Sequence, residues 1–125
     1  MDGTMGIEQV IDRYCEAWST KERAKRAEIV NEVWAESGTY SDPRSDVRGR
    51  EALVGLIDAA NAQFPPGIEI KRTSAVDAHH NVARFAWALR GEGISMEGID
   101  IAFRSDDGTR LERVIGFFGP LTPKA

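Results

Sequence analysis

Apolar residues recur at helical spacing in three stretches of the first half of the chain, which predicts three amphipathic helices. The first stretch, residues 7–18, has a stripe of Ile7, Val10, Ile11, Tyr14, Cys15 and Trp18. The second follows the capping-box pattern of Ser19 and Glu22, and its stripe consists of Ile29, Val30, Val33 and Trp34. We expect this second helix to end near Gly38.

The third helix is predicted to open at Gly49 and to end at Pro65-Pro66, since proline cannot continue a helix. Its apolar face consists of Leu53, Leu56, Ile57, Ala60 and Phe64. Between the second and third helices, Thr39 to Asp42 is short and β-prone, and Pro43 keeps Asp42 out of helical geometry. We expect a brief strand there, followed by a loop to about Arg48.

After Pro66 the hydrophobic period changes from helical to alternating, which is typical of strands. Turn-forming residues separate four such stretches, roughly residues 67–78, 82–90, 93–105 and 110–119. They predict an antiparallel meander. Helices followed by long strands favour a single α+β domain over residues 1–125, in which the helices cover one face of a curved sheet and a pocket lies between the layers.

Composition excludes several classes of partner. The net charge of −4, with basic residues scattered among acids, leaves no basic stripe for nucleic acid. No apolar run approaches the length of about 20 residues that a membrane-spanning helix needs. The N-terminal residues lack a signal-peptide pattern, so we expect a cytoplasmic location.

Neither cysteine nor histidine indicates a metal site, and we expect no cofactor. Cys15 is the only cysteine, so it forms no internal disulfide and no cysteine-built zinc site, and its place in an apolar stripe predicts a buried thiol. His79 and His80 are adjacent at a predicted hairpin, with no third ligand at suitable spacing, and are interpreted as a surface turn.

Hairpin geometry predicts which residues of the sheet face the pocket. If Gly91-Glu92 is a two-residue turn, Arg90 pairs with Gly93, and the same step from Asp107-Gly108 pairs Asp106 with Thr109. One face of the sheet then carries Phe85, Trp87, Met96, Asp100, Ile115 and Phe117. An acid in such a wall is expected to have a raised pKa and to stay protonated, as a hydrogen-bond donor. The alternative is that Asp100 lies on the outer face, because one bulge would reverse every side chain.

Five further residues are candidates for the same pocket. Tyr14 and Trp18 are four apart on the first helix, so both face the sheet, and the Tyr14 hydroxyl is expected either to point inward or to be satisfied within the core. Tyr40 and Asp42 project to the same side of an extended segment, although Asp42 is also a plain turn residue before Pro43. Trp34 is expected to reach the pocket from the end of the second helix.

Three short stretches together resemble bacterial ketosteroid isomerases, which belong to the nuclear transport factor two-like superfamily. Residues 13–17 resemble the segment with the oxyanion-hole tyrosine, here Tyr14. Residues 39–43 resemble the acidic-proline turn with the general base, here Asp42, and residues 98–103 resemble the strand with the protonated aspartate, here Asp100. The resemblance implies a cone-shaped barrel of cystatin-like fold, and it extends to SnoaL-like polyketide cyclases.

By this resemblance, Asp42 is expected to move a proton on an apolar ketone while Tyr14 and neutral Asp100 donate hydrogen bonds to the enolate oxygen. Arg44 and Arg48 stand close enough in sequence to pair with Asp42. The alternatives are a non-catalytic binding module for an apolar metabolite, a cyclase-like enzyme, or a protein-interaction domain. The outward positions of the last strands, taken as Ile99, Ile101, Phe103, Val114 and Phe118, predict a homodimer through the sheet.

Overall fold

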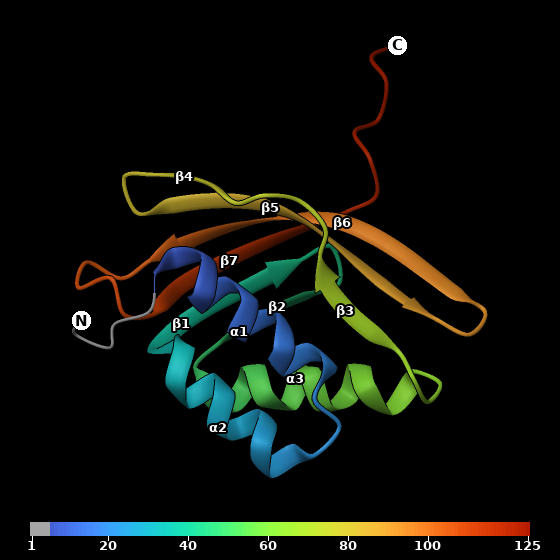
Figure 1. Ribbon diagram of the computed structural model, residues 1–125, viewed down its shortest axis with the longest axis horizontal. Helices are drawn as coiled ribbons and strands as arrows, with labels where there is room; N and C mark the ends of the chain where they lie inside the picture. The colour runs from blue at the N-terminus through green and yellow to red at the C-terminus, as the bar shows by residue number, and fades with distance from the viewer. Residues whose placement is uncertain (1–5) are drawn as a thin grey trace.

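Three helices lie across one face of a curved seven-stranded sheet (Figure 1). The computed structural model describes residues 6–125. The helices are α1 (Ile7–Ser19), α2 (Arg23–Val33) and α3 (Arg50–Gln63). The strands are β1 (Trp34–Asp42), β2 (Ser45–Arg48), β3 (Glu69–Arg72), β4 (Asp77–His79), β5 (Val82–Gly91), β6 (Ile94–Arg104) and β7 (Leu111–Phe118).

The sheet is mixed and open. Its strands follow the order β2-β1-β7-β6-β5-β3, and β4 also pairs with β5. Neighbouring strands are antiparallel except β1 and β7, which run parallel. The α+β class with helices on one face of a curved sheet is therefore confirmed. The barrel is not closed, because β2 and β3 lie at opposite edges.

The first and third helices form as their apolar stripes predict. In α1 the stripe buries Val10, Ile11 and Tyr14 against the sheet, while the opposite side carries charged residues. Helix α3 starts after Gly49, whose φ of +93° suits a residue without Cβ, and it ends just before Pro65-Pro66.

The predicted end of the second helix is wrong, and so is its cap. Helix α2 ends at Val33, and Trp34 begins β1, where it pairs with Leu111 of β7 and is fully buried. Packing of this large side chain in the core outweighs the weak helical preference of the segment. The Ser19 hydroxyl caps nothing; it bonds the backbone of Ile70 on β3 and so ties the end of α1 to the sheet.

The segment expected to be a loop after Asp42 is a strand. Residues Ser45–Arg48 form β2, which pairs antiparallel with the end of β1 through a tight turn at Pro43 and Arg44. Exposed and half-buried residues alternate along this short strand. The sequence alone does not reveal the strand, because most of its residues are polar or charged. The hairpin places Asp42, Arg44 and Ser45 at one end of the sheet.

The two long hairpins differ from the predicted registers in different ways. In the first, Arg90 pairs with Ser95 instead of Gly93, a shift of two residues that leaves the same side chains facing inward. In the second, a bulge between Phe103 and Arg104 shifts the pairing by one, so that Asp100 faces Gly116. A one-residue shift exchanges the faces of β7.

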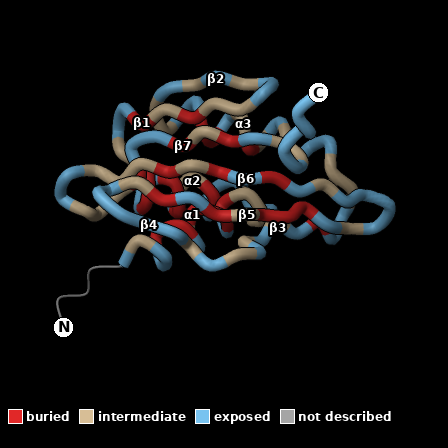
Figure 2. The backbone as a smooth tube through the Cα atoms, turned by 90° about the horizontal axis from the view of Figure 1, so that it is seen from above, coloured by how far each residue is buried: buried red, intermediate tan, exposed pale blue. Residues whose placement is uncertain are grey.

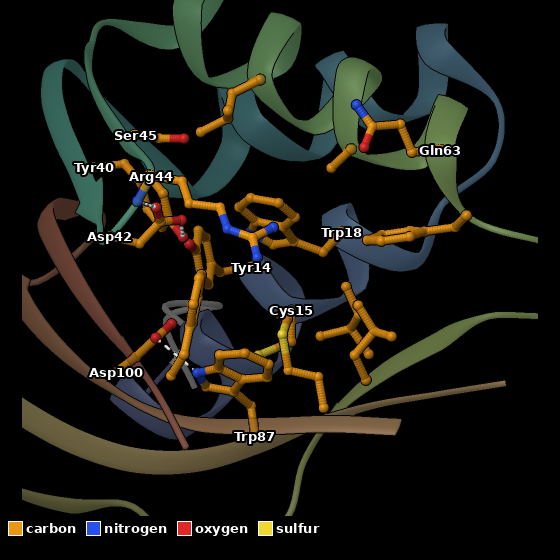
Figure 3. A pocket seen from close by; sticks show the side chains of 17 residues that line it. Tyr14, Cys15, Trp18, Tyr40, Asp42, Arg44, Ser45, Gln63, Trp87 and Asp100 are labelled. Carbon is orange, nitrogen blue, oxygen red and sulfur yellow. Dashed lines mark hydrogen bonds between the residues drawn. The ribbon is translucent and has the colours of Figure 1, made fainter. Parts of the chain in front are cut away.

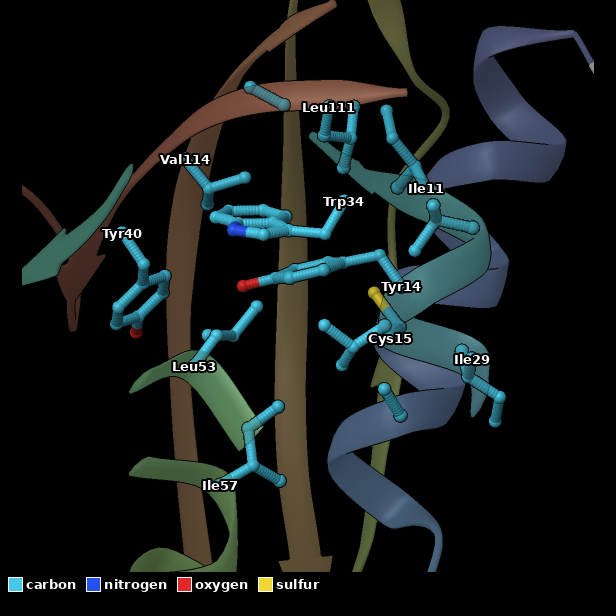
Figure 4. Close-up of a cluster of buried hydrophobic side chains, with 14 of the residues drawn as sticks. Ile11, Tyr14, Cys15, Ile29, Trp34, Tyr40, Leu53, Ile57, Leu111 and Val114 are labelled. Carbon is cyan, nitrogen blue, oxygen red and sulfur yellow. The ribbon is translucent and has the colours of Figure 1, made fainter. Parts of the chain in front are cut away.

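The core lies between the helices and the central strands (Figure 2). At its centre the Tyr14 ring stacks on Trp34, with centroids 5.6 Å apart and planes 16° apart (Figure 4). Leu53 and Ile57 of α3 and Val114 of β7 pack around this pair. None of the helices in residues 6–125 is long and apolar enough to cross a membrane.

Candidate functional site

A cavity of about 190 Å³ opens between α1, α3, β1 and the inner face of the sheet (Figure 3). Its wall is mainly apolar, with a few polar groups at one side. The lining residues are Tyr14, Cys15, Trp18, Tyr40, Asp42, Arg44, Ser45, Leu56, Ala60, Gln63, Phe64, Ile70, Trp87, Leu89, Met96, Asp100 and Phe118. An apolar pocket with a few convergent polar groups is the usual form of a small-molecule site.

Tyr14 reaches the pocket from the middle of α1. Only 2% of the residue is exposed, and its hydroxyl has no hydrogen-bond partner within residues 6–125. Burial, and next the charge of Asp100, raise the pKa of Tyr14 well above its usual value. The phenol therefore stays neutral and keeps a proton to donate, and leaving a buried hydroxyl unpaired is costly unless a ligand completes it.

Asp42 ends β1 and also lines the pocket, and the turn at Pro43 exposes both carboxylate oxygens to donors. The Tyr40 hydroxyl donates to Oδ2 at 2.6 Å, and the backbone N–H of Arg44 donates to Oδ1 at 2.8 Å. Burial, followed by the bond to Asp42, raises the pKa of Tyr40, so the phenol remains the donor. Within the described chain neither Arg44 nor Arg48 forms an ion pair with Asp42.

Asp100 lies on the inner face of β6 and is 7% exposed. The indole N–H of Trp87 donates to its Oδ1 at 2.8 Å. Burial raises the pKa of Asp100 to about 7, against the lowering effect of the Trp87 bond and together with the charge of Asp42. This increase in the pKa of Asp100 agrees with the expectation from the sequence. At a pH below this pKa the carboxyl group is protonated and can donate a hydrogen bond.

Two glycines make room for this arrangement. A Cβ on Gly116 would lie 2.9 Å from Asp100 Oδ1 and 3.5 Å from Asp42 Cβ, so a larger residue would push the acids apart. Gly98 faces Trp87 across the β5–β6 pair, where a Cβ would lie 2.4 Å from the indole ring. Gly116 lies opposite Asp100, and Gly98 lies opposite the Trp87 side chain that binds Asp100. Both strand positions therefore need glycine, which lets these side chains approach the backbone closely.

The structure brings most of the predicted pocket residues together. Tyr14, Asp42 and Asp100 line the same cavity, and their chemical roles stay predictions. Trp18, Tyr40, Trp87 and Met96 also line it, and the rings of Trp18 and Tyr40 are 5.5 Å apart.

Four predicted pocket residues lie elsewhere. Trp34 and Phe85 are buried in the core and do not line the cavity, because Trp34 starts a strand behind Tyr14 and Phe85 lies deeper along β5. Phe117 is 56% exposed on the outer face, since the bulge in the β6–β7 pair reverses β7. For the same reason Val114, expected outside, is fully buried, Phe118 lines the pocket, and Ile115 faces away from it.

Several lining residues were not predicted. Leu56, Ala60 and Phe64 form one side of α3 at intervals of four, a signal that indicates a buried face but does not tell core from pocket. Gln63, Ser45 and Leu89 carry no sequence signal for a site. Cys15, predicted to be a buried thiol, borders the cavity, and burial raises the pKa of this thiol to about 12, so it is not a nucleophilic thiolate.

No cluster of three or more potential metal ligands exists among residues 6–125. His79 and His80 lie exposed in the β4–β5 turn, with positive φ at His80 and Asn81. The pocket includes two acids and two phenols, with Tyr14 on α1, Tyr40 and Asp42 on β1 and Asp100 on β6, and this set favours hydrogen bonding and proton transfer.

Comparisons with known proteins agree with this architecture. A candidate isomerase of the SnoaL-like family from Agrobacterium tumefaciens strain C58 is 29% identical, with a TM-score of 0.83 over 90% of this chain and 97% of that one. A candidate ketosteroid isomerase from Kribbella flavida is 16% identical, with a TM-score of 0.68 over 94% and 80%. A candidate SnoaL-like polyketide cyclase from Jannaschia sp. CCS1 is 13% identical, with a TM-score of 0.73 over 90% and 83%.

The last two likenesses show the fold alone. No curated protein sequence matches the chain significantly. The model of the SnoaL-like domain matches residues 11–113, which is most of the chain and includes the larger part of α1 with Tyr14, the β1–β2 hairpin and the strand with Asp100. The chain therefore belongs to the SnoaL-like domain family, within the nuclear transport factor two-like fold.

Proposed function

We propose that this protein catalyses proton transfer on a small apolar ketone, moving a carbon–carbon double bond. One observation carries the proposal: an unpartnered Tyr14 hydroxyl, a hydrogen-bonded Asp42 and a buried Asp100 line a single apolar pocket. Burial raises the pKa of Asp100 to about 7, so below this pH the acid keeps the proton that a hydrogen-bond donor needs.

The reaction balances without any other reactant. Asp42 takes a proton from the carbon between the carbonyl and the double bond, and the electron pair of that C–H bond forms a new C=C while the carbonyl π electrons move to oxygen. Tyr14 and neutral Asp100 donate hydrogen bonds to the resulting enolate oxygen. The dienolate then takes the proton back at the γ carbon, which leaves the conjugated ketone and an ionised Asp42.

The size of the cavity limits the substrate. At about 190 Å³ it is smaller than the range of roughly 300–1,000 Å³ usual for ligand pockets, and a dry cavity of about 150 Å³ is known to hold benzene. A ring of six atoms with a substituent therefore fits better than a fused polycyclic ketone. The likeness to the SnoaL-like candidate isomerase from A. tumefaciens supports the reaction class.

The test is the isomerisation of cyclohex-3-enone, followed by the absorbance of conjugated cyclohex-2-enone. We expect Asp42→Asn to lower turnover by about 10²-fold to 10⁴-fold, the usual contribution of a general base. Asparagine retains an oxygen that accepts the Arg44 N–H, so the turn should survive. Asp46→Asn, which removes an exposed acid from the adjoining strand β2, is the matched control and should leave turnover unchanged.

The second candidate is a binding module that uses the same pocket without catalysis. The mainly apolar wall favours it, because such a wall binds an apolar metabolite whether or not Asp42 is ionised. Cyclohexenone binding to the wild type without any turnover, and equally well to Asp42→Asn, would select this candidate. Turnover that depends on Asp42 would exclude it.

A further inference from the structure

A single cationic side chain lines the pocket beside Asp42. Arg44 follows Pro43 in the β1–β2 turn, and its backbone N–H donates to Asp42 Oδ1. Its side chain extends over the cavity, with the guanidinium carbon 5.9 Å from the centre of the Phe118 ring (Figure 3). A cation at this distance from an aromatic face is held in place without losing its hydrogen-bonding capacity.

The guanidinium of Arg44 has no acidic partner within residues 6–125, unlike several other arginines of the chain. Arg13, Arg23, Arg26, Arg72 and Arg84 each form an ion pair with a nearby carboxylate. Asp42, the nearest acid in sequence, already accepts from the Tyr40 hydroxyl and the Arg44 backbone. The charge of Arg44 therefore remains available to a ligand.

Two neutral polar side chains line the same cavity with no bond of their own. Ser45, the next residue on β2, and Gln63, at the end of α3, make no side-chain hydrogen bond within the described chain. These two side chains lie on different sides of the cavity (Figure 3), so the guanidinium fork of Arg44 is the group that suits a carboxylate, which arginine binds through two parallel bonds. Tyr14 and Asp100, which line the same cavity, are the donors assigned to the ketone oxygen.

We propose that the pocket takes a ketone with a carboxylate at the end remote from the carbonyl, and that Arg44 binds this carboxylate. The inference rests on the proposed function for the orientation of the ketone and adds the class of substrate. The competing explanation is that Arg44 only offsets the negative charge of Asp42. In that case the protein would not distinguish an acid from its ester.

The experiment compares the binding of 4-acetylphenylacetate with that of its uncharged methyl ester, by calorimetric titration of the wild type, Arg44→Gln and Arg48→Gln. Both probes are one-ring ketones that undergo no double-bond shift. We expect the wild type to bind the acid more tightly and Arg44→Gln to weaken acid binding about tenfold, with less than about twofold change for the ester. Arg48→Gln removes the same charge from an exposed position outside the pocket and should change neither affinity. Raising the salt concentration should weaken binding of the acid only.

Equal affinities of the acid and the ester in the wild type, or a tenfold loss that appears equally in Arg48→Gln, would overturn the proposal. The outcome is independent of catalysis, because neither probe is converted into a different compound. Preference for the acid together with absent isomerase activity would therefore retain the carboxylate site and reject the proposed reaction. Isomerase activity without any preference for the acid over the ester would retain the proposed reaction and reject the carboxylate site.

Discussion

Asp100 is held inside the pocket by one hydrogen bond from Trp87, and its pKa of about 7 links the stability of the protein to pH. In the unfolded chain its pKa is near the ordinary value of 3.8. As pH rises from about 4 to about 7, the unfolded chain loses this proton while the folded chain retains it. The contribution of Asp100 to the free energy of unfolding is therefore complete below pH 4 and is lost by about pH 7.

We predict that Asp100→Asn, which keeps an acceptor for Trp87, stabilises the protein relative to wild type at neutral pH. The difference should be near zero below about pH 4 and reach about 4 kcal/mol above about pH 7, the order of magnitude that the pKa change implies. Urea denaturation at several pH values measures it. Asp107 is the control, because its pKa is shifted in the opposite direction. Hydrogen bonds from Ser105 and Thr109 lower this pKa to about 2, so Asp107→Asn should not stabilise the protein at neutral pH. A constant difference between Asp100→Asn and wild type at every pH would contradict the account.

Individual residues of the site were predictable where local geometry fixes the side on which they project. Tyr14 follows from the stripe of α1, and Asp42 follows from an extended segment before proline. Asp100 was placed correctly because the two-residue shift in the first hairpin preserves its face. Phe117 was misplaced because the second hairpin contains a bulge, and no residue of the Asp107-Gly108 turn indicates one.

At the scale of elements, the sequence predicts helices and long strands well where one period persists. Helices α1 and α3 begin and end close to their predicted limits, since a stripe, a glycine and a proline pair define them. The junction of α2 and β1 was not predictable from local pattern, because Val33 and Trp34 continue the helical stripe and only the burial of Trp34 against Leu111 decides otherwise. Tertiary packing outweighs propensity there.

Strand β2 was missed for a related reason. It has only four residues, and Val47 is the single apolar one among them, so the segment is too short and too polar to establish an alternating pattern. Pairing with β1 satisfies the backbone of this segment. The consequence for function is direct, because this hairpin positions Arg44 and Ser45 at the pocket.

At the scale of the whole molecule, the outer face of the sheet carries a group of exposed and half-buried apolar side chains. Ile99 is 40% exposed and Phe117 56%, and the half-buried Ile101, Phe103 and Ile115 adjoin them. The dimer surface predicted from sequence thus contains two wrong members, Val114 and Phe118, and lacks Ile115 and Phe117. A contiguous apolar patch of this kind is typical of an interaction surface.

We therefore still propose a homodimer through this face. Sedimentation at micromolar concentration should give twice the chain mass for the wild type and a monomer for Phe117→Glu, because a buried unpaired charge opposes association. Leu121→Glu places the same charge at a residue that is 91% exposed beyond β7 and should leave the dimer intact. A wild-type monomer, or dimers of equal stability in both variants, would reject the surface.

The central claim is that Asp42 removes a proton next to a ketone that Tyr14 and Asp100 hold. The most direct measurement is the exchange of the α hydrogens of cyclohexanone for deuterium in D₂O, followed by NMR below the pKa of Asp100, which is about 7. The wild type should accelerate the exchange over buffer, Asp42→Asn should not, and Tyr14→Phe should slow it by roughly 10²-fold to 10³-fold while remaining folded. Exchange at the same rate with the wild type and with Asp42→Asn would contradict the account.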